Sequence, residues 1–214
     1  MGADFPTEGE RRKRDERLHR GLLPALAALE QRARPFWCYA RMPNTFSFGL
    51  EDLDDCEDLV LCFGTLGAGV REAVDAAFAR KEYTAGYLLD RLADEWLFQG
   101  AGAVDRRVWA GLQKEGYGAT RKHAPGDPDL SLLWQKPLFS ALQAEGEIPG
   151  RVNEHSVLWP DKSLLYLFGA DRRLKGMDRR HPCMLCQKAA CTYCPDKGKK
   201  SKDGQKKGGD RHVS

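Results

Sequence analysis

Apolar residues change their spacing along the chain, and each spacing predicts a different kind of element. Leucines three to four residues apart, from Leu18 to Leu29, predict an N-terminal helix from Thr7 to about Arg34 that Pro24 would kink. Helical spacing returns in four later segments: 70–80, 84–99, 103–115 and 131–145. Short apolar runs predict strands at four places: 36–39, 59–63, 152–157 and 164–168.

Strands and helices alternate irregularly in this pattern, and most of the helix falls in the middle of the chain. Such an order favours an α+β fold, with a mixed or antiparallel sheet and packed helices, over a doubly wound parallel sheet. We expect four parts: a charged helix over 1–35, an α+β domain over 36–180, a Cys-rich segment over 181–195 and a disordered basic tail over 196–214.

The charge of the chain is unevenly distributed. The formal net charge is +3, but residues 195–214 hold seven of the 34 basic residues and only three of the 31 acidic ones. The rest of the chain is therefore nearly neutral, and the tail lacks aromatic residues that would stack on bases, so nucleic acid is an unlikely partner. No apolar run approaches the roughly 20 residues of a membrane span, and no apolar signal core follows the N-terminus. We expect a cytoplasmic protein without a membrane partner.

Cysteines are concentrated near the C-terminus. Four of the seven form the pattern C-x2-C-x4-C-x2-C-P: Cys183, Cys186, Cys191 and Cys194. Two C-x2-C pairs can turn their sulfurs toward one ion, and thiolates bind zinc and iron–sulfur clusters well. The short gap between the pairs resembles cluster-binding loops, although zinc remains equally consistent with it. The pattern predicts a metal centre, either iron–sulfur or zinc.

Several short motifs are weak separately but informative in order. A predicted strand ends in Thr65-Leu66-Gly67, and a stiff loop follows at 122–127 with the sequence Lys-His-Ala-Pro-Gly-Asp. A Leu138-Phe139 pair, the segment Val152-Asn153-Glu154 and the turn 160–163 come next. In this order, and with the terminal cysteine cluster, the chain resembles the activation domain of cobalamin-dependent methionine synthase, most closely its short standalone form.

The resemblance covers about residues 50–194 and implies a function. Members of the family bind S-adenosylmethionine and present its methyl group to a cobalamin that has lost activity while an electron arrives. The sequence has no Asp-x-His-x-x-Gly run, the usual signature of corrinoid-binding domains. The resemblance therefore implies an accessory protein that serves a corrinoid held on a partner, either a corrinoid-binding protein or a methyltransferase.

The family pattern also implies ligand-binding residues, with departures. Lys122 stands where the family has Arg, and Asp127 stands where it has Tyr. The residues implied for S-adenosylmethionine are Lys122, Ala124, Pro125, Gly126, Asp127 and Glu154, with Glu95, or Asp94 beside it, as the carboxylate for the ligand ammonium. The alternative is a noncatalytic metal-binding interaction module that has lost this ligand.

Overall fold

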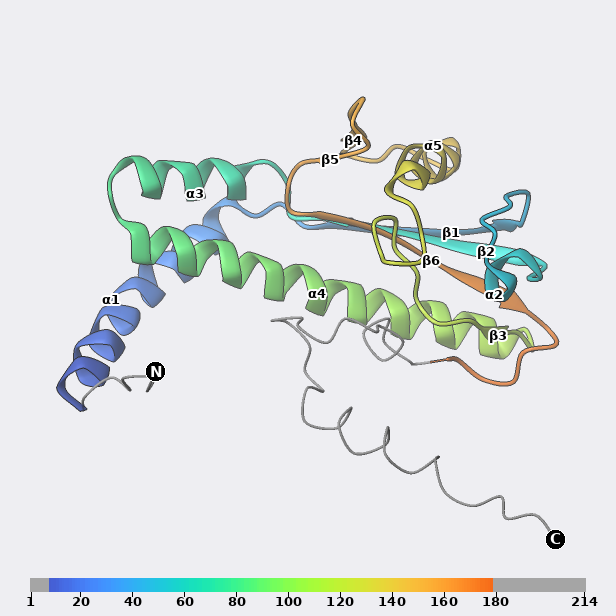
Figure 1. Ribbon diagram of the computed structural model, residues 1–214, viewed down its shortest axis with the longest axis horizontal. Helices are drawn as coiled ribbons and strands as arrows, with labels where there is room; N and C mark the ends of the chain where they lie inside the picture. Colours follow the sequence, from blue (N-terminus) through green and yellow to red (C-terminus); the bar gives the residue numbers. More distant parts are fainter. Residues whose placement is uncertain (1–7, 179–214) are drawn as a thin grey trace, which may run out of the picture.

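A four-stranded antiparallel sheet forms the centre of the computed structural model, which describes residues 8–178 (Figure 1). Its strands lie in the order β1-β2-β6-β3, and every neighbouring pair is antiparallel. Their bounds are Phe36–Pro43 for β1, Asp58–Thr65 for β2, Ser163–Asp171 for β6 and Gly118–Ala119 for β3. The α+β class with an antiparallel sheet and packed helices is confirmed.

Helices cover the sheet from both sides (Figure 1). The long helix α4 runs along one face and joins the helices α1 and α3 at one end of the molecule, while α5 and a small β-hairpin lie over the other face. A short helix, α2, connects β1 to β2. The bounds are Glu8–Arg32 for α1, Glu51–Asp54 for α2, Gly69–Ala79 for α3, Tyr83–Lys114 for α4, Leu132–Trp134 for the 3-10 helix η1, Gln135–Ala144 for α5, Arg151–Val152 for β4 and Leu158–Trp159 for β5.

Strand β2 shows why the short apolar run at 59–63 predicts a strand. Its alternate side chains enter opposite cores: Leu61 and Phe63 pack toward α5, whereas Val60 and Cys62 pack toward α4. A strand that is covered on both faces has no polar side to present, so its sequence is continuously apolar instead of alternating.

Helix α4 corrects a prediction, because the segments 84–99 and 103–115 form one helix without a break at Gly100 or Gly102. Gly100 is required by close packing. A Cβ atom built there would lie 2.1 Å from Cζ2 of Trp37, and one built at Gly64 on β2 would lie 1.9 Å from Cζ3 of the same ring. The indole of Trp37 thus fills a slot between helix and sheet that both glycines leave open.

Two other predicted elements differ in length. The predicted helix over 131–145 begins with η1 and becomes α5 at Gln135, so that Pro137 falls in the first turn, where its missing N–H needs no acceptor. The predicted strand over 152–157 reaches only Val152. Asn153 ends it because its Oδ1 accepts hydrogen bonds from the backbone N–H groups of His155 and Val157 and closes a turn.

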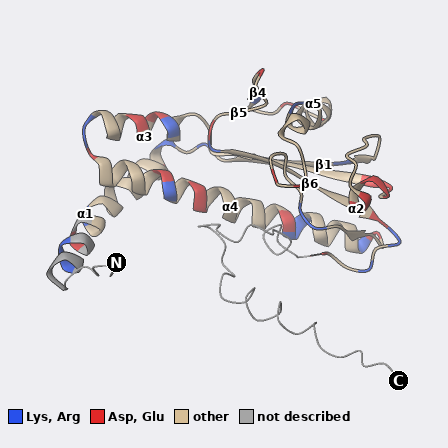
Figure 2. Cartoon of the chain, in the orientation of Figure 1, with Lys and Arg blue, Asp and Glu red and all other residues tan. Residues whose placement is uncertain are grey.

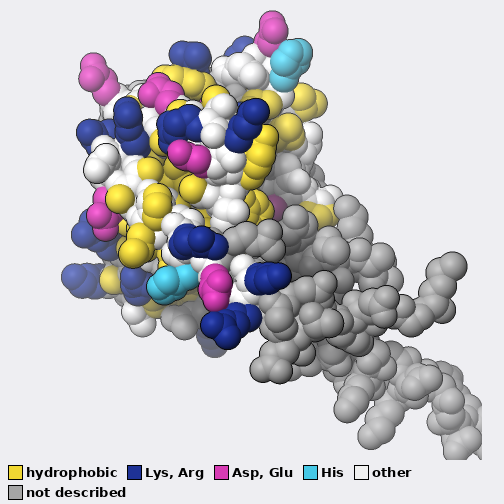
Figure 3. Space-filling view, turned by 90° about the vertical axis from the view of Figure 1, so that its left-hand side faces the viewer, with side chains coloured by type: hydrophobic (Ala, Val, Ile, Leu, Met, Phe, Trp, Pro, Cys, Tyr) yellow, Lys and Arg dark blue, Asp and Glu magenta, His cyan; other side chains and the backbone are white. Residues whose placement is uncertain are grey.

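The N-terminal helix is confirmed as α1, which continues through Pro24 and packs on α3 and α4 through Ala25 and Leu29. Figure 3 views this end of the molecule and shows hydrophobic side chains scattered among charged ones. Exposed members of these elements include Leu23, Phe78, Tyr83 and Tyr87.

Candidate functional site

The edge of the sheet beside β6 contains a bulge. Ala119 pairs with Ala170 of β6, and His123 pairs again with Leu167. Three residues of the edge segment, 120–122, therefore lie opposite two residues of β6. The extra residue interrupts the ladder. Within the bulge, consecutive side chains still alternate between the two faces of the sheet: Lys122 faces α4, whereas Arg121 and His123 face α2.

On the α4 face, Lys122 forms a compact pair. Its Nζ lies 2.7 Å from Oδ2 of Asp105 and 4.1 Å from the centroid of the Tyr166 ring. Tyr166 is fully buried and donates a hydrogen bond to the carbonyl of Ala101. A third of the Lys122 side chain remains exposed, so a molecule arriving from solvent can reach its ammonium group.

Asp105 has a second oxygen, Oδ1, that is buried and has no partner with hydrogen-bond geometry among the described residues. The Tyr166 hydroxyl is nonetheless close to this carboxylate, because burial and the neighbouring Asp105 both raise the pKa of Tyr166. A buried acceptor without a donor is costly, and a bound ammonium or N–H group would remove that cost. The Lys122 ammonium and the unpaired oxygen of Asp105 thus lie side by side. The partly exposed Lys122 side chain is suited to an anionic group such as a carboxylate, whereas Oδ1 of Asp105 is buried and would meet a ligand ammonium only after the Asp105 side chain turns outward.

Asp105 was not among the residues predicted for the ligand. The sequence carries one signal for it, because Asp105 is an acid four residues after Ala101 and three before Val108, both buried on the sheet-facing side of α4. A carboxylate on the sheet-facing side of a helix lies next to the hydrophobic core. That signal does not identify Lys122 as the partner of Asp105, because Lys122 lies in a different segment and only the fold brings the two residues together.

The other predicted loop residues build the turn that carries Lys122. Asp127 Oδ2 accepts a hydrogen bond from the backbone N–H of Ala124, and burial raises the pKa of Asp127. Gly126 has a φ of 97°, a conformation that side chains rarely adopt, and follows Pro125. Ala124 packs against the core beneath α4. Asp127 thus closes the turn where the family places a tyrosine.

The remaining predicted carboxylates lie elsewhere. Glu154 is exposed at the tip of the β4–β5 hairpin, 3.5 Å from the exposed His155. Glu95 is exposed on α4, and its neighbour Asp94 forms an ion pair of 2.6 Å with Lys162. Among the described residues, the helix carboxylate that pairs with Lys122 is Asp105, ten residues further along the chain than Glu95.

On the other face of the bulge, Arg121 and His123 share two carboxylates. His123 Nε2 lies 3.0 Å from Asp52 Oδ2, which is also 3.5 Å from Arg121 Nε. Arg121 Nη2 donates to Asp129 Oδ2, which lies 3.6 Å from His123 Nδ1. We call these four residues the charge cluster. His123 is fully buried, and only 7% of the Arg121 side chain is exposed.

The distances indicate which imidazole nitrogen carries the proton. A carboxylate can only accept, so Nε2, at hydrogen-bond distance from Asp52, carries it in the neutral ring. Nδ1 then has no hydrogen-bond donor among the described residues. Burial lowers the pKa of His123 below its ordinary value of 6.5, and Arg121 lowers it further, while the carboxylates of Asp52 and Asp129 oppose the shift. His123 is therefore neutral at pH 7.

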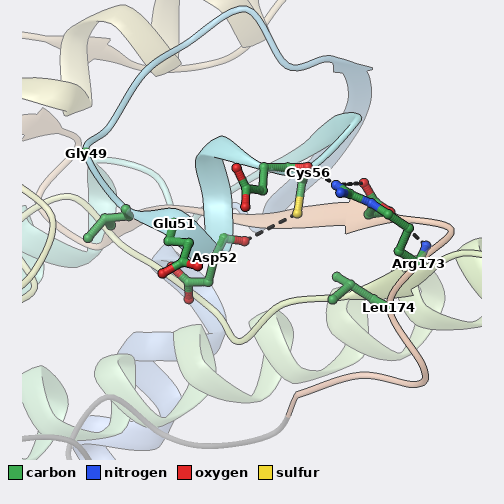
Figure 4. Close-up of a pocket in the computed structure, with 9 residues that line it drawn as sticks. Gly49, Glu51, Asp52, Cys56, Arg173 and Leu174 are labelled. Carbon is green, nitrogen blue, oxygen red and sulfur yellow. Dashed lines mark hydrogen bonds and ion pairs between the residues drawn. The ribbon is translucent and has the colours of Figure 1, made fainter.

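Asp52 also lines a surface cavity of about 640 Å³ beside α2, with Gly49, Glu51, Cys56, Arg173 and Leu174 around it (Figure 4). Acidic residues gather on this side of the molecule around α2 (Figure 2). Cys56 donates to the carbonyl of Asp52, and burial raises the pKa of its thiol to about 11. The thiol is protonated at neutral pH and does not supply a nucleophile.

The segments that carried the sequence resemblance contact one another around β2 and β6. Ser163 Oγ donates to Thr65 Oγ1 at 2.8 Å, which joins the Pro-x-x-Ser turn to the Thr-Leu-Gly segment. Phe139 packs edge-on against Phe63, with ring centroids 5.3 Å apart. His123 in the loop pairs with Leu167 of β6. These motifs, far apart in the sequence, are neighbours in the fold.

The predicted metal ligands Cys183, Cys186, Cys191 and Cys194 lie outside the described residues. Within 8–178, no group of three or more His, Cys, Asp or Glu side chains is arranged to hold a metal ion. No helix in that range is both long and apolar enough to cross a membrane.

Comparison of the chain with protein-family models and with curated proteins finds no match.

Proposed function

We propose that this protein is an accessory factor of a corrinoid-dependent methyltransferase system and that it binds S-adenosylmethionine at Lys122 and Asp105. Bound there, S-adenosylmethionine would supply a methyl group for reactivating a corrinoid that a partner protein carries. The chain's own task is to hold the ligand by its amino-acid end and orient it toward that partner.

The observation that carries this proposal is the pair of Lys122 with the open oxygen of Asp105. The amino-acid end of S-adenosylmethionine has one carboxylate and one ammonium group on the same carbon. Lys122 Nζ lies 2.7 Å from Asp105 Oδ2, and Oδ1 of the same carboxylate remains without a donor among described residues. Lys122 matches the carboxylate of the ligand, and Asp105 would match its ammonium once the side chain turns the buried oxygen outward.

The contacts between the motif segments support the proposal independently of the Lys122 pair. Ser163 and Thr65 are hydrogen bonded, and Phe139 packs on Phe63, so segments that were matched only by order form one structural unit.

Titration calorimetry of the full chain with S-adenosylmethionine tests the proposal. We expect binding, and we expect Lys122→Ala or Asp105→Asn to weaken it by about tenfold to hundredfold, the range that a hydrogen bond to a charged group supplies. Lys136→Ala is the matched control, because Lys136 is exposed on α5 and far from the pair in the fold.

Two results would contradict the proposal. One is an absence of binding by the wild-type chain, alone and with a corrinoid protein present. The other is binding that both variants leave unchanged, which would move the ligand away from Lys122.

The terminal cysteines favour a second candidate, a noncatalytic metal-binding interaction module. The C-x2-C-x4-C-x2-C-P pattern of Cys183 to Cys194 is independent of the Lys122 pair. Anaerobic purification followed by iron, sulfide and zinc analysis tests it. We expect metal bound in stoichiometric amount and lost when Cys186 and Cys191 are both replaced by Ser. A metal-free wild-type protein would exclude this module.

A further inference from the structure

The charge cluster lies directly behind the residue that the proposed function needs. Lys122 stands between Arg121 and His123, and both neighbours are tied into the cluster on the opposite face of the sheet. The backbone of His123 is also fixed, because its N–H donates to the Leu167 carbonyl and its own carbonyl accepts from the Leu167 N–H. Thr120 is held as well, because its N–H donates to the Gly169 carbonyl and its Oγ1 accepts from the Gly169 N–H. A shift of the cluster can therefore move the bulge only at Arg121 and Lys122.

The two shared oxygens make the cluster sensitive to one proton. With neutral His123, Arg121 is the only cation between the carboxylates of Asp52 and Asp129. A proton on Nδ1 adds a second donor that faces Asp129 Oδ2 from 3.6 Å, beyond hydrogen-bond distance. Closing that gap draws Asp129 toward the imidazole and away from the Arg121 guanidinium, since the His123 backbone is held.

Other groups around His123 do not oppose this movement. From the loop, the facing charged groups are Arg121, Asp127 and Asp129, and from α2 the facing group is Asp52. Strand β6 packs against it with apolar residues, including Leu167. Burial disfavours the charged ring, so the proton arrives only in mildly acidic solution.

We propose that His123 is a positioning residue for Lys122, and that its protonation loosens Arg121, shifts the bulge and weakens ligand binding at Lys122. The inference deepens the proposed function, on which its ligand rests, and makes the same site responsive to acidity. His123 acts on Lys122 through the backbone and the charge cluster. It does not contact the ligand itself.

Calorimetry with S-adenosylmethionine between pH 5 and pH 7.5 tests the effect on affinity. We expect the Kd of the wild type to rise by about threefold or more toward pH 5, a change that calorimetry resolves. His123→Gln, which keeps an amide donor for Asp52 but cannot titrate, should flatten the profile. His155→Gln is the matched control, because this histidine is exposed on the β4–β5 hairpin, and it should leave the profile as in the wild type.

The variant Asp127→Asn distinguishes the effect of protonating His123 from that of protonating Asp127. Burial raises the pKa of Asp127, which also faces His123. If this variant, and not His123→Gln, flattens the profile, the proposed role of His123 is wrong.

A ligand-free measurement keeps the inference distinct from the proposed function. Lysines carrying ¹³C-methyl groups report their surroundings by NMR. The Lys122 resonance, assigned with Lys122→Arg, should show an inflection below pH 6.5 in the wild type and none in His123→Gln. An unchanged Lys122 signal across this range would overturn the inference even where the ligand binds. A clear inflection without ligand binding would retain it and reject the proposed function.

Discussion

The two faces of the bulged edge strand hold their charges in different ways. On the α2 face, Arg121 and His123 are buried and share two carboxylates, so that four groups support one another. On the α4 face, Lys122 is partly exposed and has one carboxylate partner, with one oxygen left open. The buried face has the features of a structural anchor, and the exposed face has those of a binding site.

The difference shows how alternation along one strand can separate two roles. Consecutive residues point to opposite sides of a sheet, so Arg121 and His123 can be committed to stability while Lys122 remains available. A loop without the sheet pairing at Ala119 and His123 would not keep these roles apart.

The largest effect should come from breaking the buried face. Arg121→Ala leaves Asp52 and Asp129 without their buried cation, and we expect a loss of about 3 kcal/mol in the free energy of unfolding. Urea unfolding followed by circular dichroism measures it. Arg107→Ala, at an exposed position of α4, should change stability by about 0.5 kcal/mol or less. Equal effects of both variants would mean that the cluster is not an anchor.

A fall in pH should weaken the packing of the α2 face before it affects the α4 face. Because burial lowers the pKa of His123 in the folded protein, the unfolded chain binds the proton more readily. Stability is therefore complete above about pH 6.5 and falls as the pH drops through that value toward the folded pKa. Thermal unfolding between pH 5 and pH 7.5 should show this fall in the wild type and a shallower one in His123→Gln. Identical slopes would contradict the assignment of a buried neutral imidazole.

The smallest effect on stability is expected at the exposed face. Lys122→Met keeps an apolar contact with Tyr166 while removing one partly exposed ion pair, which is worth about 1 kcal/mol or less. Urea unfolding under the same conditions as for Arg121→Ala gives the direct comparison. A loss as large as that of Arg121→Ala would assign Lys122 to the scaffold instead of a binding site.

Local sequence patterns predicted the central strands well and the candidate site only in part. The run at 59–63 is apolar because β2 is covered on both faces, and this property can be read without the fold. Lys122 was identified from its loop. Its partner Asp105 was not, because the two are joined only when β6 and α4 pack together.

The two errors have different physical origins. Gly100 predicts a helix end by its intrinsic propensity, yet packing against Trp37 outweighs that preference and α4 continues. The strand predicted over 152–157 stops early because the side chain of Asn153 closes a turn. The first outcome depends on a contact between distant segments, which no local window contains. The second depends on a turn within residues 153–157, for which Asn153 is a local signal.

The slot that Gly64 and Gly100 leave for the Trp37 indole limits which substitutions related sequences can carry at these positions. A single change at either glycine collides with the ring, at 1.9 Å and 2.1 Å, so each position is closed to substitution while the tryptophan remains. In a lineage where a smaller side chain replaces Trp37, both glycines become free to change. These three residues, from β1, β2 and α4, are therefore coupled, and a related sequence that changes either glycine should carry a smaller side chain in place of Trp37.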